Sequence, residues 1–365
     1  MDLTKKYLIN GPNNVIRLTN NEKVLYIFAD IHIDIKYQNE CPINDKYDSI
    51  DFDKLLFLFI KKEKIKKYDL FVEIDQPYFK REKNNTFRYT YINQIRKLFK
   101  SIIQIKDNKM TINKKYPNFR FHYSDIRDTI DANDYFFDSY CNFTYPFPCS
   151  LFALNQIIDK TDEAILILFN LITDIKNSDN THIKKILSKY RNKNNQAKIK
   201  LIIKDILIKN TYDTIKNLAR LITFIKTSII KLKKITIDKI TIIDINAQIF
   251  KMFTTCKSNA YMTYVLLTDL FFIRRFIDKQ YITNCILYTG SNHMYNIMYL
   301  LVKYFDFTVS NVYYMHIDFK LNKISKLKST NYNYIDILNK YFCNYNRMLE
   351  FNQCVHLIDF PSNFK

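Results

Sequence analysis

The sequence predicts an α/β fold in which a mostly parallel sheet has flanking helices and a basic, all-helical insertion. The first observation is three short apolar runs, rich in β-branched and aromatic residues, at Val24–Ala29, Leu70–Ile74 and Cys285–Thr289. Such runs are typical of parallel strands buried on both faces. The second is that each run precedes a polar turn and a helical pattern. We therefore expect residues 1–140 and 246–365 to form two halves of one α/β domain, separated by the insertion, residues 141–245.

Helices and a further strand fill the first half. A helix is expected over residues 52–65. Asp51 and Asp53 lie near its start and three lysines near its end, which is the charge distribution that the helix dipole favours. A second helix is expected over residues 87–105, and a further strand over residues 118–123.

The rest of the chain is predicted to be largely helical. Helices are expected over residues 151–176 and 181–235, over 247–278 before the third apolar run, and over 295–304 after it. Residues 311–319 and 355–360 are typical of edge strands. Charge is concentrated in part of this region: residues 176–235 hold sixteen Lys or Arg and three Asp, so they carry +13 of the formal net charge of +20. These residues predict either solvated helix faces or a surface that contacts nucleic acid, without sequence specificity, or an acidic partner.

Composition excludes several classes of protein. The chain has only two glycines, Gly11 and Gly290, so the glycine-rich phosphate loops are absent and no nucleotide cofactor of those types is expected. The seven cysteines are odd in number and form no C-x-x-C, which favours neither a disulfide framework nor a zinc module and is compatible with a reducing compartment. No secretory signal or membrane span is predicted, so an intracellular location is expected.

Polar side chains gather where the predicted strands end. The first run leads to Asp30 and His32, the second to Glu73, and the third to Gly290 and His293. The strand over 118–123 adds a fourth group, which consists of His122, Asp125 and Arg127. Open α/β sheets bind ligands at the carboxyl ends of their strands, so the sequence predicts a metal-ligand or acid–base site there.

The order of these motifs resembles the TraB, Tiki and ChaN-like superfamily, whose members carry G-x-x-H after the first strand, a Glu after a second strand, and a later G-x-x-H followed by a helix. The corresponding residues are Ala29-Asp30-Ile31-His32, then Glu73, then Gly290-Ser291-Asn292-His293. Ala29 replaces the first glycine. The chain looks especially like an uncharacterised branch of that superfamily from large DNA viruses, because it shares Asp30-Ile31-His32 before Cys41-Pro42, His122 to Arg127, and Thr268 to Phe271 with Arg275. The resemblance covers roughly residues 20–140 and 245–310.

The resemblance implies a divalent-metal-dependent hydrolase, as in the Tiki proteases, with His32, Glu73 and His293 as metal ligands. His122 is a further candidate ligand. The donor types suit Mn, Co, Zn or Fe, Asp30 or Asp125 is the candidate base, and Arg127 or Arg275 is the candidate for holding a substrate oxygen. The alternative is an inactive viral structural or binding protein whose basic helical insertion contacts nucleic acid or a partner. If viral, the protein is expected in the host cytoplasm or the virion.

Overall fold

The chain forms two compact units. The computed structural model describes residues 7–32, 34–37, 41, 47–73, 90–102, 104–106, 109–111, 115–126, 140, 150–177, 184, 186–187, 190–234, 239–314, 354–357, 360–361 and 364. The first unit consists of Met1–Asp125 and Phe272–Lys365, and the second of Ile126–Phe271. Each unit is described separately below.

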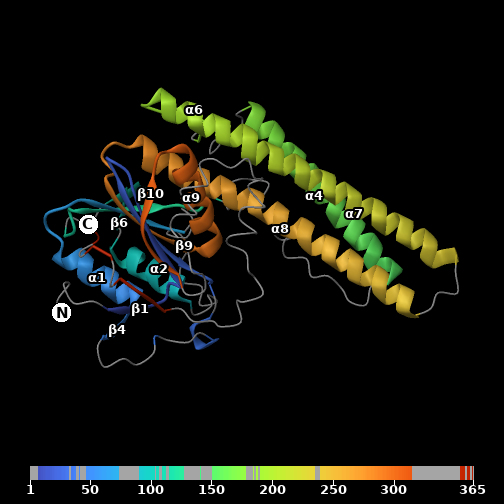
Figure 1. Cartoon of the computed structure of the whole chain (residues 1–365), viewed down its shortest axis with the longest axis horizontal. Helices are drawn as coiled ribbons and strands as arrows, with labels where there is room; N and C mark the ends of the chain where they lie inside the picture. Colours follow the sequence, from blue (N-terminus) through green and yellow to red (C-terminus); the bar gives the residue numbers. More distant parts are fainter. Residues whose placement is uncertain are drawn as a thin grey trace. The chain divides into compact units, whose positions relative to one another are not determined.

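A six-stranded sheet is the centre of the first unit (Figure 1). Its spatial order is β10 (Thr308–Tyr314), β2 (Asn14–Thr19), β3 (Val24–Asp30), β9 (Asn284–Gly290), β5 (Tyr68–Val72) and β8 (Phe119–Tyr123). Strands β3, β9, β5 and β8 are parallel neighbours, whereas β2 is antiparallel to both β3 and β10. The predicted mostly parallel α/β sheet is confirmed.

Two smaller sheets accompany it. Strand β1 (Leu8–Asn10) lies between β11 (Cys354–His356), to which it is antiparallel, and β4 (Ser49–Asp51), to which it is parallel. Strands β6 (Gln104–Lys106) and β7 (Lys109–Thr111) form an antiparallel pair. A short 3₁₀ helix, η1, spans Ile35–Tyr37.

A disulfide joins Cys41, which lies outside the strands, to Cys354 of β11, 313 residues apart in the sequence. The expectation that the cysteines favour no disulfide was wrong for this pair. The odd number and irregular spacing of the cysteines carried no information about which strands would become neighbours. In the fold, the pairing of Asn10 with Cys354 and the bond from the Cys41 amide to Asn10 Oδ1 bring the two sulfurs together.

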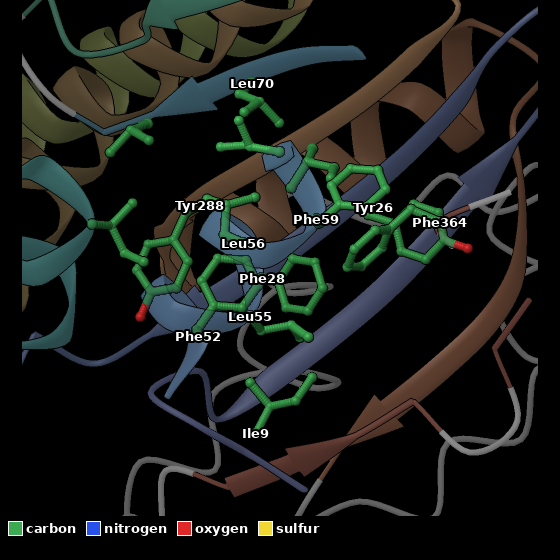
Figure 2. Packing of buried hydrophobic residues seen from close by; sticks show 14 of the residues in the cluster. Ile9, Tyr26, Phe28, Phe52, Leu55, Leu56, Phe59, Leu70, Tyr288 and Phe364 are labelled. Carbon is green, nitrogen blue, oxygen red and sulfur yellow. The ribbon is translucent and has the colours of Figure 1, made fainter. Parts of the chain in front are cut away.

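Two helices cover one face of the six-stranded sheet. Helix α1 (Phe52–Lys62) and helix α2 (Tyr91–Ile102) bury their apolar sides against alternate residues of the strands. Figure 2 shows part of this core, in which the rings of Phe28 and Phe52 lie 4.4 Å apart and those of Phe52 and Tyr288 lie 5.0 Å apart. Because strand side chains alternate between faces, Tyr26, Phe28, Leu70 and Tyr288 all point to this side. Burial of these large apolar groups holds the strand ends in register.

Helix α9 (Ser291–Tyr304) follows β9 directly and contacts β3 and β9. Eleven of its residues are buried, including Ser291 and His293 in its first turn. The start of the helix is therefore fixed at the carboxyl end of β9, next to the predicted site residues Gly290 and His293.

The second unit is helical wherever elements are assigned in its described residues. Helix α4 (Leu151–Asn177) packs against α7 (Lys209–Lys234), as Figure 1 also shows. The two are antiparallel, because Phe169 and Lys176 near the end of α4 contact Tyr212 near the start of α7. Helix α6 (Lys193–Ile202) and a π-helical segment, η5 (Ile203–Ile208), lead into α7. Helix α8 (Lys239–Asp278) begins in the second unit and ends in the first.

Within the described part of the chain, none of the helices has the length and apolar character that crossing a membrane requires.

Most predicted elements are present, with shifted limits. The helix expected over 247–278 begins earlier, at Lys239, and the edge strand expected over 311–319 begins at Thr308. Residues 315–319 and 87–89 of the predicted elements lie outside the described residues. The helix expected over 87–105 ends at Ile102, and the last two residues of that range belong to β6, so the prediction was wrong there. Strands β1, β2, β4, β6 and β7 were not predicted, because three-residue strands have no periodicity to detect and Asn14–Thr19 is interrupted by Arg17.

Candidate functional site

The order of the strands brings three sequence motifs to one edge of the sheet. Strand β9 lies between β3 and β5, with Asp30 opposite Gly290 and Val72 opposite Tyr288. The amide of Glu73, just after β5, extends this register by donating to the carbonyl of Tyr288 at 3.0 Å. The segments that follow the three strands therefore begin at the same level of the sheet.

Glu73 is the centre of the resulting cluster. Its carboxylate is buried, and Oε2 accepts hydrogen bonds from the Gly290 amide at 2.7 Å and the Thr289 hydroxyl at 2.9 Å. His32 Nε2 lies 3.2 Å from the same oxygen, and His293 Nε2 lies 3.4 Å from Oε1. The structure thus brings together His32, Glu73 and His293 from three distant segments.

His32 has an unusual backbone conformation. Its φ of 53° lies in the left-handed region, which a non-glycine residue adopts at an energetic cost. The Asp30 side chain supports this turn, because Oδ1 accepts from the His32 amide at 3.1 Å and also contacts Nδ1 of the ring. The turn directs the ring back over the sheet edge, so that Nε2 reaches Glu73.

Gly290 leaves the space that the His32 ring occupies. A Cβ atom at this position would lie 3.0 Å from His32 Nε2 and 3.5 Å from Glu73 Oε2. The Gly290 backbone, with φ of −70°, is one that any residue adopts. Glycine is therefore needed here for the approach of the imidazole, and not for backbone freedom.

Residues of β9 and α9 form hydrogen bonds with both the side chain and the backbone of Asp30. Its Oδ2 accepts a hydrogen bond of 3.0 Å from the buried Tyr288 hydroxyl, while Ser291 Oγ lies 3.2 Å from the Asp30 carbonyl and 3.2 Å from Asn13 Oδ1. With both carboxylate oxygens engaged, Asp30 is arranged to orient His32.

The charges within the cluster determine its protonation. Burial alone would lower the pKa of His32, but the carboxylates of Asp30 and Glu73 raise it to about 10. Burial alone would raise the pKa of Glu73, but the imidazoles of His293 and His32 hold it well below its usual range. At neutral pH the cluster therefore pairs an imidazolium with a carboxylate. The His32 side chain is 36% exposed, so water screens its part of this pairing.

His122 and Arg275 belong to a second group of polar side chains. His122 Nε2 lies 2.7 Å from Asp69 Oδ1, and Arg275 Nη2 lies 2.9 Å from His122 Nδ1. Arg120 also bonds to both Asp69 carboxylate oxygens, at 2.8 and 2.6 Å. Burial lowers the pKa of His122, so its neutral form, with a proton on Nε2, satisfies both contacts. Both ring nitrogens are thus occupied by protein groups.

Two further predicted site residues are Asp125, which the structure describes, and Arg127, which it does not. Asp125 is buried just beyond the end of β8, at the same edge of the sheet as Glu73. Arg127 lies outside the described residues.

Sequence analysis missed two residues that position this region. Arg96, on α2, donates to the Glu73 carbonyl from Nη2 at 2.6 Å, and no local pattern marks it out. Asp69, fully buried in β5, organises the second group. Its position inside an apolar run was a usable signal, because a buried carboxylate requires partners.

The cluster has the donor chemistry of a divalent-metal site, but not the geometry of one. Among the residues that the structure describes, no three His, Cys, Asp or Glu side chains are positioned to hold a metal ion. The contacts explain this, because the two nitrogens of His32 are directed at Asp30 and Glu73. A metal ligand must be a neutral imidazole, so metal binding here requires His32 to lose its proton.

The fold and the cluster define an α/β protein with a mostly parallel sheet and an imidazole–carboxylate cluster at the carboxyl edge of that sheet. Comparison with known families places the chain more specifically. It belongs to the family of unknown function DUF5847, whose model matches residues 7–240 and again 155–365.

Relatives of the chain occur in a giant virus. Over 98% of its length the chain is 25% identical to uncharacterized protein R161 of Acanthamoeba polyphaga mimivirus, 98% of which is covered. It is 27% identical to uncharacterized protein R706 and 26% identical to uncharacterized protein R160 of the same virus, with 97% of each covered. No solved structure matches the chain. The resemblance to proteins of a large DNA virus is confirmed, and the wider resemblance to the TraB and Tiki superfamily stays a prediction.

Proposed function

We propose that the chain is a metal-dependent hydrolase of the TraB and Tiki type, with its reactive centre at His32, Glu73 and His293. The observation that carries this proposal is the convergence of two imidazoles on one buried carboxylate from three strand ends: His32 Nε2 lies 3.2 Å and His293 Nε2 lies 3.4 Å from the Glu73 carboxylate. The strained backbone of His32 adds support, because such strain persists where the surrounding structure enforces it and is often found at functional sites. The shifted pKa values of His32 and Glu73 are also typical of active sites.

His32, Glu73 and His293 would hold the metal ion after His32 has lost its proton and its Nε2 has turned from Glu73 toward the ion. Imidazole nitrogens and a carboxylate oxygen suit Mn, Co, Zn or Fe. When bound, such an ion supplies a Lewis acid that polarises a carbonyl or phosphoryl oxygen of the substrate.

The other residues around the cluster orient the proposed metal ligands. Asp30 orients the His32 ring through Nδ1, which leaves Nε2 facing the centre. Thr289 and the Gly290 amide fix Glu73 Oε2, while Arg96 fixes the Glu73 backbone. Asp30 was predicted as a base, and its engaged oxygens favour the positioning role instead.

The proposal is tested by titrating chelator-treated full-length protein with Zn²⁺ and Mn²⁺ in a calorimeter. We expect one site in the wild type, and a loss of affinity of roughly 10–100-fold or more in His293→Ala and Glu73→Gln. The matched control is His356→Ala, which removes an imidazole from β11. Hydrolysis is then measured on fluorogenic peptides, carboxyl esters and phosphate esters, with and without the metal that binds.

Two outcomes would overturn the proposal. One is a wild type that binds neither metal. The other is a metal affinity that His293→Ala and His356→Ala change equally, because the site would then lie elsewhere.

The second candidate function is binding without catalysis. We infer that the basic helices, predicted over residues 141–245, are an insertion within the α/β domain. One observation favours an insertion: the second unit is a single continuous segment of the chain, and the first unit consists of the segments before and after it. With the charge of residues 176–235, this arrangement supports a structural or binding protein of the virus. Metal binding without hydrolysis of any substrate tested would favour this candidate.

A further inference from the structure

Helix α7 carries a row of basic side chains along one exposed face. Lys209, Lys216, Arg220 and Lys231 are all exposed. At 3.6 residues per turn they fall within about 60° of one another around the helix axis, and they span about 33 Å along it. We call these four residues the α7 basic row.

The opposite face of α7 is apolar and covered. Leu218, Leu221 and Ile225 are fully buried, and the helix packs against α4. Because this packing fixes which side of α7 is buried, it also fixes the row in solvent. A helix that binds a membrane surface presents an apolar face to the lipid, and the apolar face of α7 is already occupied within the protein.

The charges of the row are not neutralised within the described part of the chain. None of its four side chains forms an ion pair with another described residue, and Arg220 bonds only to the neutral Asn217. Asp213 is also exposed and lies on the same face, which leaves the face with a net charge of about +3.

The side chains between the basic residues indicate the kind of partner. Thr223 and Thr227 lie between Arg220 and Lys231 on the same face, and both are exposed. None of the four residues of the row is aromatic, and the exposed ring beside it, Tyr212, already contacts Phe169 and Lys176 of α4, so it is not a free platform for the base stacking that single-strand binding usually requires. The row also contains no large apolar anchor of the type that dominates protein interfaces. Cations spaced along one face of a long helix suit the phosphates of a duplex.

We propose that the α7 basic row binds the phosphate backbone of double-stranded nucleic acid without sequence specificity. Its length of about 33 Å corresponds to about one turn of a duplex. Lysine is a point charge that contacts phosphate well and discriminates bases poorly, so affinity is expected to come from counterion release. This proposal does not depend on the metal-dependent hydrolase.

The test measures binding of the full-length protein to a fluorescently labelled 20-base-pair DNA duplex by anisotropy, from 25 to 200 mM salt. The row variant is K209Q/K216Q/R220Q/K231Q. The matched control, K62Q/K64Q/K226Q/K251Q, removes the same charge from exposed lysines outside the row. Thermal melts show whether both variants are folded, and K209R/K216R/K231R, which keeps the charge, provides a second variant that should bind as the wild type does.

We expect the wild type to bind with an affinity that falls steeply with salt. The row variant should bind at least tenfold more weakly at 25 mM salt, and its log–log salt slope should be smaller by up to about 4, because each phosphate contact contributes about 0.9. The control variant should keep most of the slope. Binding that is absent at 25 mM salt, or equally weakened in both variants, would overturn the proposal. So would tighter binding to a single strand of the same length or to polyglutamate.

Discussion

Nε2 of His32 lies 3.2 Å from Oε2 of Glu73, although the two residues are 41 positions apart and follow different strands. The contact depends on β9, which lies between the two strands and contributes the Gly290 amide to the same carboxylate oxygen. Gly290, 217 positions after Glu73 in the sequence, thus connects two residues of the amino-terminal half of the chain. Three predictions follow from this arrangement and from the disulfide.

Replacing Gly290 by alanine should separate His32 from Glu73 while the fold persists. The added Cβ would lie 3.0 Å from His32 Nε2, so the ring must move away, and the pKa of His32 should fall from about 10 toward its ordinary value. Overpacking of this kind costs about 1–3 kcal/mol of stability. The measurement is an NMR titration of the His32 ring in metal-free protein.

Gly11→Ala is the control for this substitution. Gly11 has φ of +121°, so alanine there strains the backbone and should lower stability. It should leave the pKa of His32 unchanged. If Gly290→Ala has the same His32 pKa as the wild type, Gly290 does not determine the contact.

The stability that His32 contributes should depend on pH. Because the folded-state pKa of about 10 lies above the unfolded value near 6.5, protonated His32 stabilises the fold fully below about pH 6.5. This contribution is lost as the pH rises through about 10. In chelator, the melting temperature of the wild type should exceed that of His32→Gln by several degrees at pH 6, and the difference should shrink steadily to pH 10. A difference that is constant with pH would contradict the prediction.

Reduction of the disulfide should destabilise the first unit. The bond between Cys41 and Cys354 closes a loop of more than 300 residues, and a native disulfide typically contributes about 2–5 kcal/mol. Thermal melts with and without dithiothreitol should differ for the wild type and coincide for the variant C41S/C354S. Melts of the wild type that reductant leaves unchanged would show that the bond contributes no stability.

The sequence by itself determined the four parallel strands and the chemistry at their ends. Runs such as Val24–Ala29 and Cys285–Thr289 are apolar over their whole length, and that pattern is sufficient because a strand buried on both faces has no polar side to show. The motif residues Asp30, Glu73 and Gly290 were found for the same reason, since each breaks an apolar run where a strand ends.

Only the tertiary structure decided the order of the strands and the partners of the polar groups. The insertion of β9 between β3 and β5 is a choice among non-local pairings that all bury the same apolar residues, so no local pattern specifies it. That choice separates His122, which lies between Asp69 and Arg275, from the His32–Glu73 contact. The tertiary structure also decides which cysteines meet: Cys354 pairs with Asn10 across β11 and β1, and the Cys41 amide donates to the Asn10 side chain, so two residues that are distant in the sequence are joined.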